Sequence, residues 1–339
     1  MGGIYEKYSP RFTPPPQYTD CVLEDSLILI VPCFNEAGNL QRFLSQARDE
    51  IMRIRNDINP RLQAQILFID DGSEDETLCI LRALCANDKS LHYIAFSRNF
   101  GKEAAIFAGL QYAKESDCGV CALLDADLQH PLGLLPQMYS EIFTNQLDCV
   151  YAVRKNREGE GFVKSALSKS FYKINNLLSS TKLVQNSTDY RCFNAKYLSA
   201  LCACDEYHRF SKGLFEWVGF RNQAIEYENI TRQDGVSSWS NTKLFSYALS
   251  AITSFSIAPL RFVALLGFVV SILGIIYAFY IVCMAVFYDT KVAGYPSIMC
   301  AIVVFGGLNL SALGIIGEYI GRSYEQSKRR PHFIIAESL

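Results

Sequence analysis

Two carboxylates separated by one residue follow an apolar run in the first half of the chain. Residues 121–124 carry no charge, Asp125 and Asp127 come directly after them, and Gln129 lies two residues further on. In an extended strand alternate side chains point to the same side, so these three oxygen-bearing groups would share one face. Carboxylate and amide oxygens suit Mg2+ or Mn2+, which often holds a diphosphate as well. The motif therefore predicts a metal site, although a short acidic pair can also cap a helix.

The acidic pair belongs to a regular alternation of strands and helices. Apolar runs typical of strands occur at 27–31, 65–69, 91–96, 121–124 and 148–153, with helical stretches between them. This order predicts an α/β domain whose mostly parallel sheet is covered on both faces, with ligands bound beyond the carboxyl ends of the strands. Further polar residues expected at that edge are Glu36, Asp70, Asp71 and Arg98.

Several function classes are excluded by composition and motifs. The 339 residues hold 32 Lys and Arg against 34 Asp and Glu, a balance that argues against a nucleic-acid partner. No Gly-x-Gly-x-x-Gly follows the first strand and no P-loop sequence occurs, so neither a dinucleotide site nor a P-loop is predicted. The twelve cysteines are scattered and no secretory signal precedes them, which favours free thiols in a reducing cytoplasm.

The C-terminal third has the composition of a membrane domain. Charge is absent from 262–288 and from 292–317, and each stretch exceeds the roughly 20 residues that cross a bilayer. Two transmembrane helices are therefore predicted, the alternative being two buried core helices. Residues 242–258 show apolar side chains at helical spacing, which indicates an interfacial helix or a helix packed on the sheet. The positive charges flanking the two spans place both chain ends in the cytoplasm.

Four segments together resemble the family 2 glycosyltransferases of GT-A fold. They are VPCFNE at 31–36, IDDGS at 69–73, SRNFGKEAA at 97–105 and DADLQHP at 125–131. More narrowly, the chain resembles polyprenyl-phosphate glycosyltransferases such as bactoprenol glucosyltransferase and dolichyl-phosphate mannose synthase. This resemblance covers 26–330, and the segments 306–310 and 317–324 are similar to the second membrane span of the bactoprenol branch.

The resemblance implies a metal-dependent, inverting transfer of a sugar from a UDP-sugar, UDP-glucose or a related hexose, to polyprenyl (undecaprenyl) phosphate. It implies Mg2+ or Mn2+ at Asp125, Asp127 and Gln129. The donor-binding residues are then expected to be Pro32, Phe34, Glu36, Asp70, Asp71, Lys102 and Asp125. A lipid phosphate is already ionised at neutral pH, so its oxygen needs little help from a strong base.

Basic residues after the sheet are candidates for holding the acceptor phosphate. Arg154 and Arg157 follow the fifth strand, where guanidinium groups could grip a phosphate, although an ordinary solvated charge run is the alternative. Asp189 and Arg191 belong to a short motif similar to one in the family, where they could orient substrate or form a structural ion pair. The expected catalytic residues are Asp127, Asp189 and Arg154, and the expected phosphate contacts are Arg154, Arg157, Arg191, Arg209 and Lys212. Trp217 is expected in the acceptor-side wall or in the core.

One position departs from the family pattern. Relatives carry Gly-x-Ser-Lys near the next strand, whereas this chain has Ser238 where the lysine would stand. Lys243 could replace that charge, or substrate handling could differ.

The sequence therefore predicts five segments and one main activity. The segments are a flexible leader (1–25), a cytosolic GT-A domain (26–235), an interfacial segment (236–258), a two-helix transmembrane domain (259–322) and a cytosolic tail (323–339). We expect a multi-pass enzyme of the inner (plasma) membrane, and the resemblance implies a homotetramer. The alternatives are a processive polysaccharide synthase of the same fold and a non-catalytic sugar-nucleotide sensor or scaffold.

Overall fold

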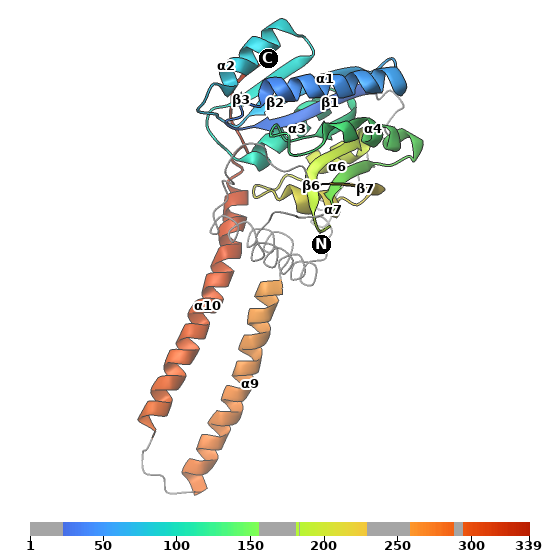
Figure 1. Ribbon diagram of the computed structural model, residues 1–339. Coiled ribbons are helices and arrows are strands. Elements are labelled where there is room, and N and C mark those ends of the chain that lie inside the picture. The colour runs from blue at the N-terminus through green and yellow to red at the C-terminus, as the bar shows by residue number, and fades with distance from the viewer. Residues whose placement is uncertain (1–22, 156–180, 183, 229–257, 288–293) are drawn as a thin grey trace, which may run out of the picture.

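A single mixed sheet organises the N-terminal two thirds of the chain (Figure 1). The computed structural model describes residues 23–155, 181–182, 184–228, 258–287 and 294–339. The strands are β1 (Leu23–Cys33), β2 (Gln63–Asp70), β3 (Leu91–Phe96), β4 (Cys118–Leu123), β5 (Cys149–Arg154), β6 (Ser187–Asn194), β7 (Asn222–Tyr227) and β8 (Ile335–Ser338). They form an eight-stranded sheet in the order β7-β5-β6-β4-β1-β2-β3-β8.

The first four strands lie parallel, as the alternation of strands and helices predicted. β1 pairs in parallel with both β2 and β4, and β2 pairs in parallel with β3. Beyond β4 the direction changes, because β6 runs antiparallel to both β4 and β5, while β7 is parallel to β5. The predicted α/β fold with a mostly parallel sheet is confirmed, with a reversal at β6 that the sequence did not indicate.

Helices cover both faces of the sheet. They are α1 (Leu40–Asp57), α2 (Thr77–Asn87), α3 (Lys102–Glu115), α4 (Leu135–Thr144), α6 (Ala195–Ala203) and α7 (Ser211–Trp217), with a short 3-10 turn at Leu132–Leu134. Along β1, Leu27, Leu29 and Val31 pack on the face of α1, α2 and α4, while Ile28 and Ile30 pack on the face of α3, α6 and α7. This alternation explains why the strand is apolar throughout.

Helix α3 lies unusually close to the sheet. A Cβ added at Gly109 would lie 2.2 Å from Cγ2 of Ile30, so the helix can sit at this depth only with glycine there. The N-terminus of α3 is thereby held at the carboxyl edge of the sheet, which is where the predicted site residues gather.

Two long helices follow the sheet domain. α9 (Ala258–Phe287) and α10 (Tyr295–Ser327) run beside each other away from the sheet (Figure 1). Large apolar side chains are exposed on both, including Phe268, Leu273 and Leu310 at 60% or more, so the two are not core helices. Over the residues that the structure describes, no helix meets the combined length and apolarity of a membrane span. The two predicted helices are therefore present, but within the described residues neither meets the criteria for a transmembrane helix.

Other predicted segments lie outside the described residues. These are the leader up to residue 22, Arg157, Ser238, Lys243 and the interfacial segment up to residue 257.

The C-terminal end of the chain returns to the sheet. β8 pairs antiparallel with β3, and Arg82 on α2 forms an ion pair of 2.7 Å with Glu337. The ring of Phe333 stacks on Phe96 at the end of β3, with centroids 4.9 Å apart. The last residues are thus part of the sheet domain, whereas the sequence was interpreted as a separate cytosolic tail at 323–339.

We expect Phe333→Ala to destabilise the sheet domain by about 1–3 kcal/mol, because it removes a partly buried ring and its stacking contact with Phe96. Thermal and urea unfolding of the full chain would measure this loss. The matched control is Ile334→Ala, since Ile334 is 53% exposed and its backbone carbonyl would still accept from Ser97. Equal stability of the two variants would show that the stacked ring contributes nothing.

Candidate active site

The acidic motif lies on the loop after β4. The strand ends at Leu123, two residues before Asp125, and Leu128 has a left-handed backbone with φ of 57°. The backbone amide of Gln129 donates to Asp127 Oδ1 at 3.1 Å, and its side-chain amide donates to Asp127 Oδ2 at 2.6 Å. The prediction that strand alternation orients these three groups was wrong, because a tight turn positions them instead.

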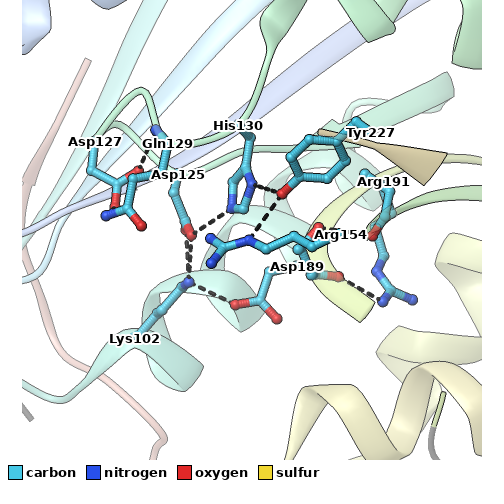
Figure 2. A network of polar contacts seen from close by, with 11 residues as sticks. Lys102, Asp125, Asp127, Gln129, His130, Arg154, Asp189, Arg191 and Tyr227 are labelled. Atoms are coloured by element: carbon cyan, nitrogen blue, oxygen red, sulfur yellow. Dashed lines mark hydrogen bonds and ion pairs between the residues drawn. The ribbon is translucent and has the colours of Figure 1, made fainter. Parts of the chain in front are cut away.

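Lys102, the first residue of α3, joins two carboxylates from different strands (Figure 2). Its Nζ lies 2.7 Å from Asp125 Oδ1, 2.9 Å from Asp125 Oδ2 and 2.6 Å from Asp189 Oδ2. Asp125 follows β4 and Asp189 lies on the neighbouring antiparallel strand β6. One ammonium group therefore connects α3, the β4 loop and β6.

The three charges shift one another's pKa values. Burial opposes ionisation of Asp125 and Asp189, but Lys102 holds the pKa of both carboxyl groups below the ordinary value. Burial also opposes the charge on Lys102, yet the two carboxylates raise the pKa of its ammonium. Water reaches 45% of the Lys102 side chain, so solvent screening limits the size of these shifts but not their direction. Lys102, Asp125 and Asp189 are therefore all charged at neutral pH.

A second chain of contacts links the same carboxylate to Arg154. His130 Nε2 lies 3.6 Å from Asp125 Oδ2, and its Nδ1 lies 2.7 Å from the hydroxyl of Tyr227. Arg154 Nε donates to that hydroxyl at 3.1 Å. Arg154 and Tyr227 are register partners on the parallel strands β5 and β7, which explains their contact.

His130 and Tyr227 belong to this network although neither was expected at the site. His130 could have been found from its place directly after the acidic motif. Tyr227 carries no such signal, because its role depends on the pairing of β7 with β5.

Asp71 fixes the loop that precedes α3. Its carboxylate accepts from the backbone amides of Phe100 at 2.7 Å and Gly101 at 2.9 Å. Gly72 has φ of 67°, and a Cβ there would lie 2.4 Å from the backbone of Arg98, so the two loops touch directly. Burial raises the pKa of Asp71 to about 6, although the two amides act in the opposite direction. Asp71 therefore positions the start of α3, and with it Lys102.

The expected nucleotide-binding residues gather at the ends of β1 and β2. Pro32 is paired with Ile69 and Cys33 with Asp70 in the parallel register, so the two strand ends lie side by side. Phe34 is 44% exposed, and the Glu36 carboxylate accepts from Asn39 at 2.7 Å. The loops after both strands are joined by a hydrogen bond from the Asn35 amide to the Ser73 hydroxyl at 2.9 Å.

Comparison with known proteins identifies the family of this chain. The family model described as "Glycosyl transferase family 2" matches residues 28–202. The chain belongs to that family. A bactoprenol glucosyl transferase of Shigella phage SfV is 35% identical over 307 residues, which cover 91% of this chain and 97% of the relative. CsbB of Bacillus subtilis (strain 168), named as a glycosyltransferase, is 39% identical over 310 residues, which cover 91% of each chain.

A solved structure resembles this glycosyltransferase more distantly. Glucosyl-3-phosphoglycerate synthase from Mycobacterium tuberculosis, in complex with Mn2+, UDP and phosphoglyceric acid, matches with 13% identity and a TM-score of 0.42. The match covers 68% of this chain and 76% of the synthase. The expected GT-A-like α/β fold follows instead from family membership and the observed sheet.

The basic residues expected at the acceptor phosphate of this glycosyltransferase lie in different settings. Arg154 is half-buried at the end of β5, whereas Arg191 is 1% exposed and lies over the ring of Phe215 at 3.5 Å. Arg209 is 8% exposed, lies over Phe107 and donates to backbone carbonyls of residues 201 and 204. The structure thus brings Arg154 to the Asp125 network and places the other two guanidinium groups beneath the surface.

Two further expected residues lie near α7. Lys212 is half-buried and close enough to Asp189 to lower the pKa of that carboxyl. Trp217 is 61% exposed and lines a hollow of about 520 Å³ with Ala200, Ala203, Cys204, Asp205, Glu206, Val218 and Phe220. Trp217 is therefore not a core residue.

The residues of the acidic motif fit a divalent cation by their chemistry. Asp125, Asp127 and Gln129 offer hard oxygen donors, which Mg2+ and Mn2+ prefer. Asp125 is held here by Lys102 and His130, and no group of three His, Cys, Asp or Glu side chains within the described ranges is arranged to hold a metal ion. A cation bound at the motif would therefore share Asp125 with these neighbours or take it from them.

We expect the buried Asp71 carboxyl to make unfolding pH-dependent. Because its pKa is higher in the folded protein, this group stabilises the fold most below about pH 4, and that contribution is lost as the pH rises through about 6. The stability difference between wild type and Asp71→Asn should therefore shrink from pH 4 to pH 7 in urea titrations. A difference that grows with pH would show that the two amides outweigh burial.

Proposed function

We propose that this glycosyltransferase moves a sugar from a UDP-sugar, UDP-glucose or a related hexose, to polyprenyl phosphate. The observation that carries the proposal is the similarity to a bactoprenol glucosyl transferase, which extends over 91% of this chain. That match reaches well beyond the residues of the family model, so it includes a large part of the C-terminal third. The acidic site at the carboxyl edge of the sheet is consistent with a diphosphate donor.

The donor side of the proposed reaction is formed by the ends of β1, β2 and β4. Phe34, Glu36 and Asp70 would contact the nucleoside, and Asp125, Asp127 and Gln129 would hold Mg2+ or Mn2+. Bound there, the cation would offset the charge that develops on the leaving diphosphate. Buried carboxylates close to the nucleotide give hydrogen-bond acceptors for its N–H and hydroxyl groups.

The acceptor side would be formed by Arg154, Lys212 and Asp189, and Arg157, which lies outside the described residues, is added to this proposal from the sequence alone. Arg154 precedes Asp189 in the sequence and Lys212 follows it. Both are partly accessible cations, which suit a phosphate. Direct attack of that phosphate on the sugar would invert the anomeric centre. Arg191 and Arg209 are buried against rings and carbonyl groups, so we assign them to holding β6 and α7 in place.

The lipid acceptor requires contact with a membrane. We propose that α9 and α10 provide it, because apolar side chains are exposed along both helices and charge is absent from 262–288 and 292–317. The enzyme would be a multi-pass protein of the plasma membrane, with its sheet domain and both ends in the cytoplasm, and a homotetramer. The proposed segments are the leader (1–25), the catalytic domain (26–235), the interfacial segment (236–258), the transmembrane domain (259–322) and the tail (323–339).

Asp127→Asn should reduce sugar transfer by about a hundredfold or more, since loss of even an outer metal contact costs 10–100-fold. The assay incubates membranes that contain the protein with labelled UDP-glucose and polyprenyl phosphate, and counts organic-extractable, acid-labile label. Asp49→Asn on the exposed face of α1 is the control and should retain activity. Full transfer by Asp127→Asn would refute the metal assignment, and label in a polymer would favour a processive synthase.

Arg154→Gln should raise the KM for polyprenyl phosphate about tenfold to a hundredfold, because a charge-assisted hydrogen bond contributes about 1.5–3 kcal/mol. The KM for the UDP-sugar should change little. The neighbouring Lys155→Gln removes the same charge from an exposed side chain and is the matched control. A KM increase of the same size in both variants would indicate a general charge effect and not a phosphate contact at Arg154.

A further inference from the structure

The ammonium group of Lys102 occupies a position between carboxylates that the proposed reaction assigns to different tasks. Its Nζ lies within 2.9 Å of both oxygens of Asp125 and 2.6 Å from Asp189. We propose that Lys102 is a built-in counter-ion that competes with the divalent cation for Asp125 and is released when a nucleoside diphosphate binds. This inference rests on the proposed function and adds that cation binding at Asp125 depends on the nucleoside diphosphate.

Both carboxylate oxygens of Asp125 already contact a cationic group. A carboxylate offers about four lone-pair positions, and here the ammonium of Lys102 contacts both oxygens while His130 approaches Oδ2 at 3.6 Å. The Asp125 side chain is 21% exposed, so little water is available to replace these contacts. A divalent ion that binds Asp125 must therefore displace the ammonium or tolerate its repulsion at short range.

Lys102 can change partners without a change of fold. Its backbone lies at the start of α3, next to Gly101, whose amide donates to Asp71. Its side chain is 45% exposed and ends in a compact charge on a flexible four-carbon stem. The fixed backbone and accessible side chain allow the ammonium to leave Asp125 while Asp189 or a new anion holds it.

A nucleoside diphosphate supplies that new anion. Without it, moving Lys102 from Asp125 costs an ion pair, and a divalent cation next to the ammonium adds repulsion. With it, the phosphate oxygens offer Lys102 a partner and bind the metal as well. The diphosphate and the cation should therefore bind with strong positive cooperativity, and an empty site should take up little free metal.

The experiment measures Mn2+ binding to the purified full chain by electron paramagnetic resonance, with and without UDP. Lys102→Met removes the charge at similar side-chain length and should bind Mn2+ alone about tenfold more tightly than wild type, since a nearby unit charge is lost. The enhancement of Mn2+ binding by UDP should fall by about the same factor, because one linkage produces both effects. Lys114→Met, at the exposed far end of α3, is the matched control and should leave both quantities unchanged.

Lys102→Gln is a second variant, for the case that the methionine variant does not fold. The glutamine amide has no charge but can still donate a hydrogen bond to Asp189. Mn2+ affinity in both Lys102 variants that is unchanged or weaker than wild type would overturn the inference while leaving the metal site intact. Absence of Mn2+ binding in every protein, even with UDP, would overturn the proposed metal-dependent function together with it. If Lys114→Met also bound Mn2+ more tightly, the cause would be the change in net charge and not the position of Lys102. That result would overturn the inference as well.

Discussion

The ion pairs of Lys102 with Asp125 and Asp189 are the interaction on which the arrangement of the site depends. These residues come from α3, the loop after β4 and the antiparallel strand β6, so the pairs join segments that are up to 87 residues apart. Two carboxylates beside each other repel, and burial makes their charges more costly. A positive charge between them is therefore required for both to remain ionised at this edge of the sheet.

Contacts elsewhere in the fold fix the position of Lys102 beside the two carboxylates. α3 can approach β1 because residue 109 is a glycine, and the loop that precedes α3 is fixed by the carboxylate of Asp71. Asp71 itself follows β2, the strand next to β1. The position of the Lys102 backbone is thus set by the packing of α3 on β1 and by the hydrogen bonds of Asp71 to the preceding loop, while its side chain is 45% exposed.

Part of this structure could be predicted from the sequence, because some of its causes are local. Continuous apolar runs such as 27–31 define buried parallel strands, and polar residues that follow them must lie at one edge. The reversal at β6 and the return of β8 depend on pairings between distant segments, which no local pattern encodes. The turn at Leu128 was missed for a local reason, because a left-handed backbone is uncommon for leucine and the acidic pair was assigned to a strand that ends at Leu123. Tyr227 enters the site through its register with Arg154, which becomes visible only when β7 is placed.

The two sides of the site differ in how they are held. On the donor side, backbone amides and short side chains fix the loops, as in the contacts of Asp71 with Phe100 and of Asn35 with Ser73. On the proposed acceptor side, Arg154 donates to the hydroxyl of Tyr227. That hydroxyl contacts His130, whose ring in turn lies next to Asp125. A change at Asp125 is therefore transmitted to Arg154 through side chains alone. In the proposed reaction, a cation that takes Asp125 from His130 would disturb the contacts that hold Arg154, so the donor site and the acceptor phosphate are coupled by this chain.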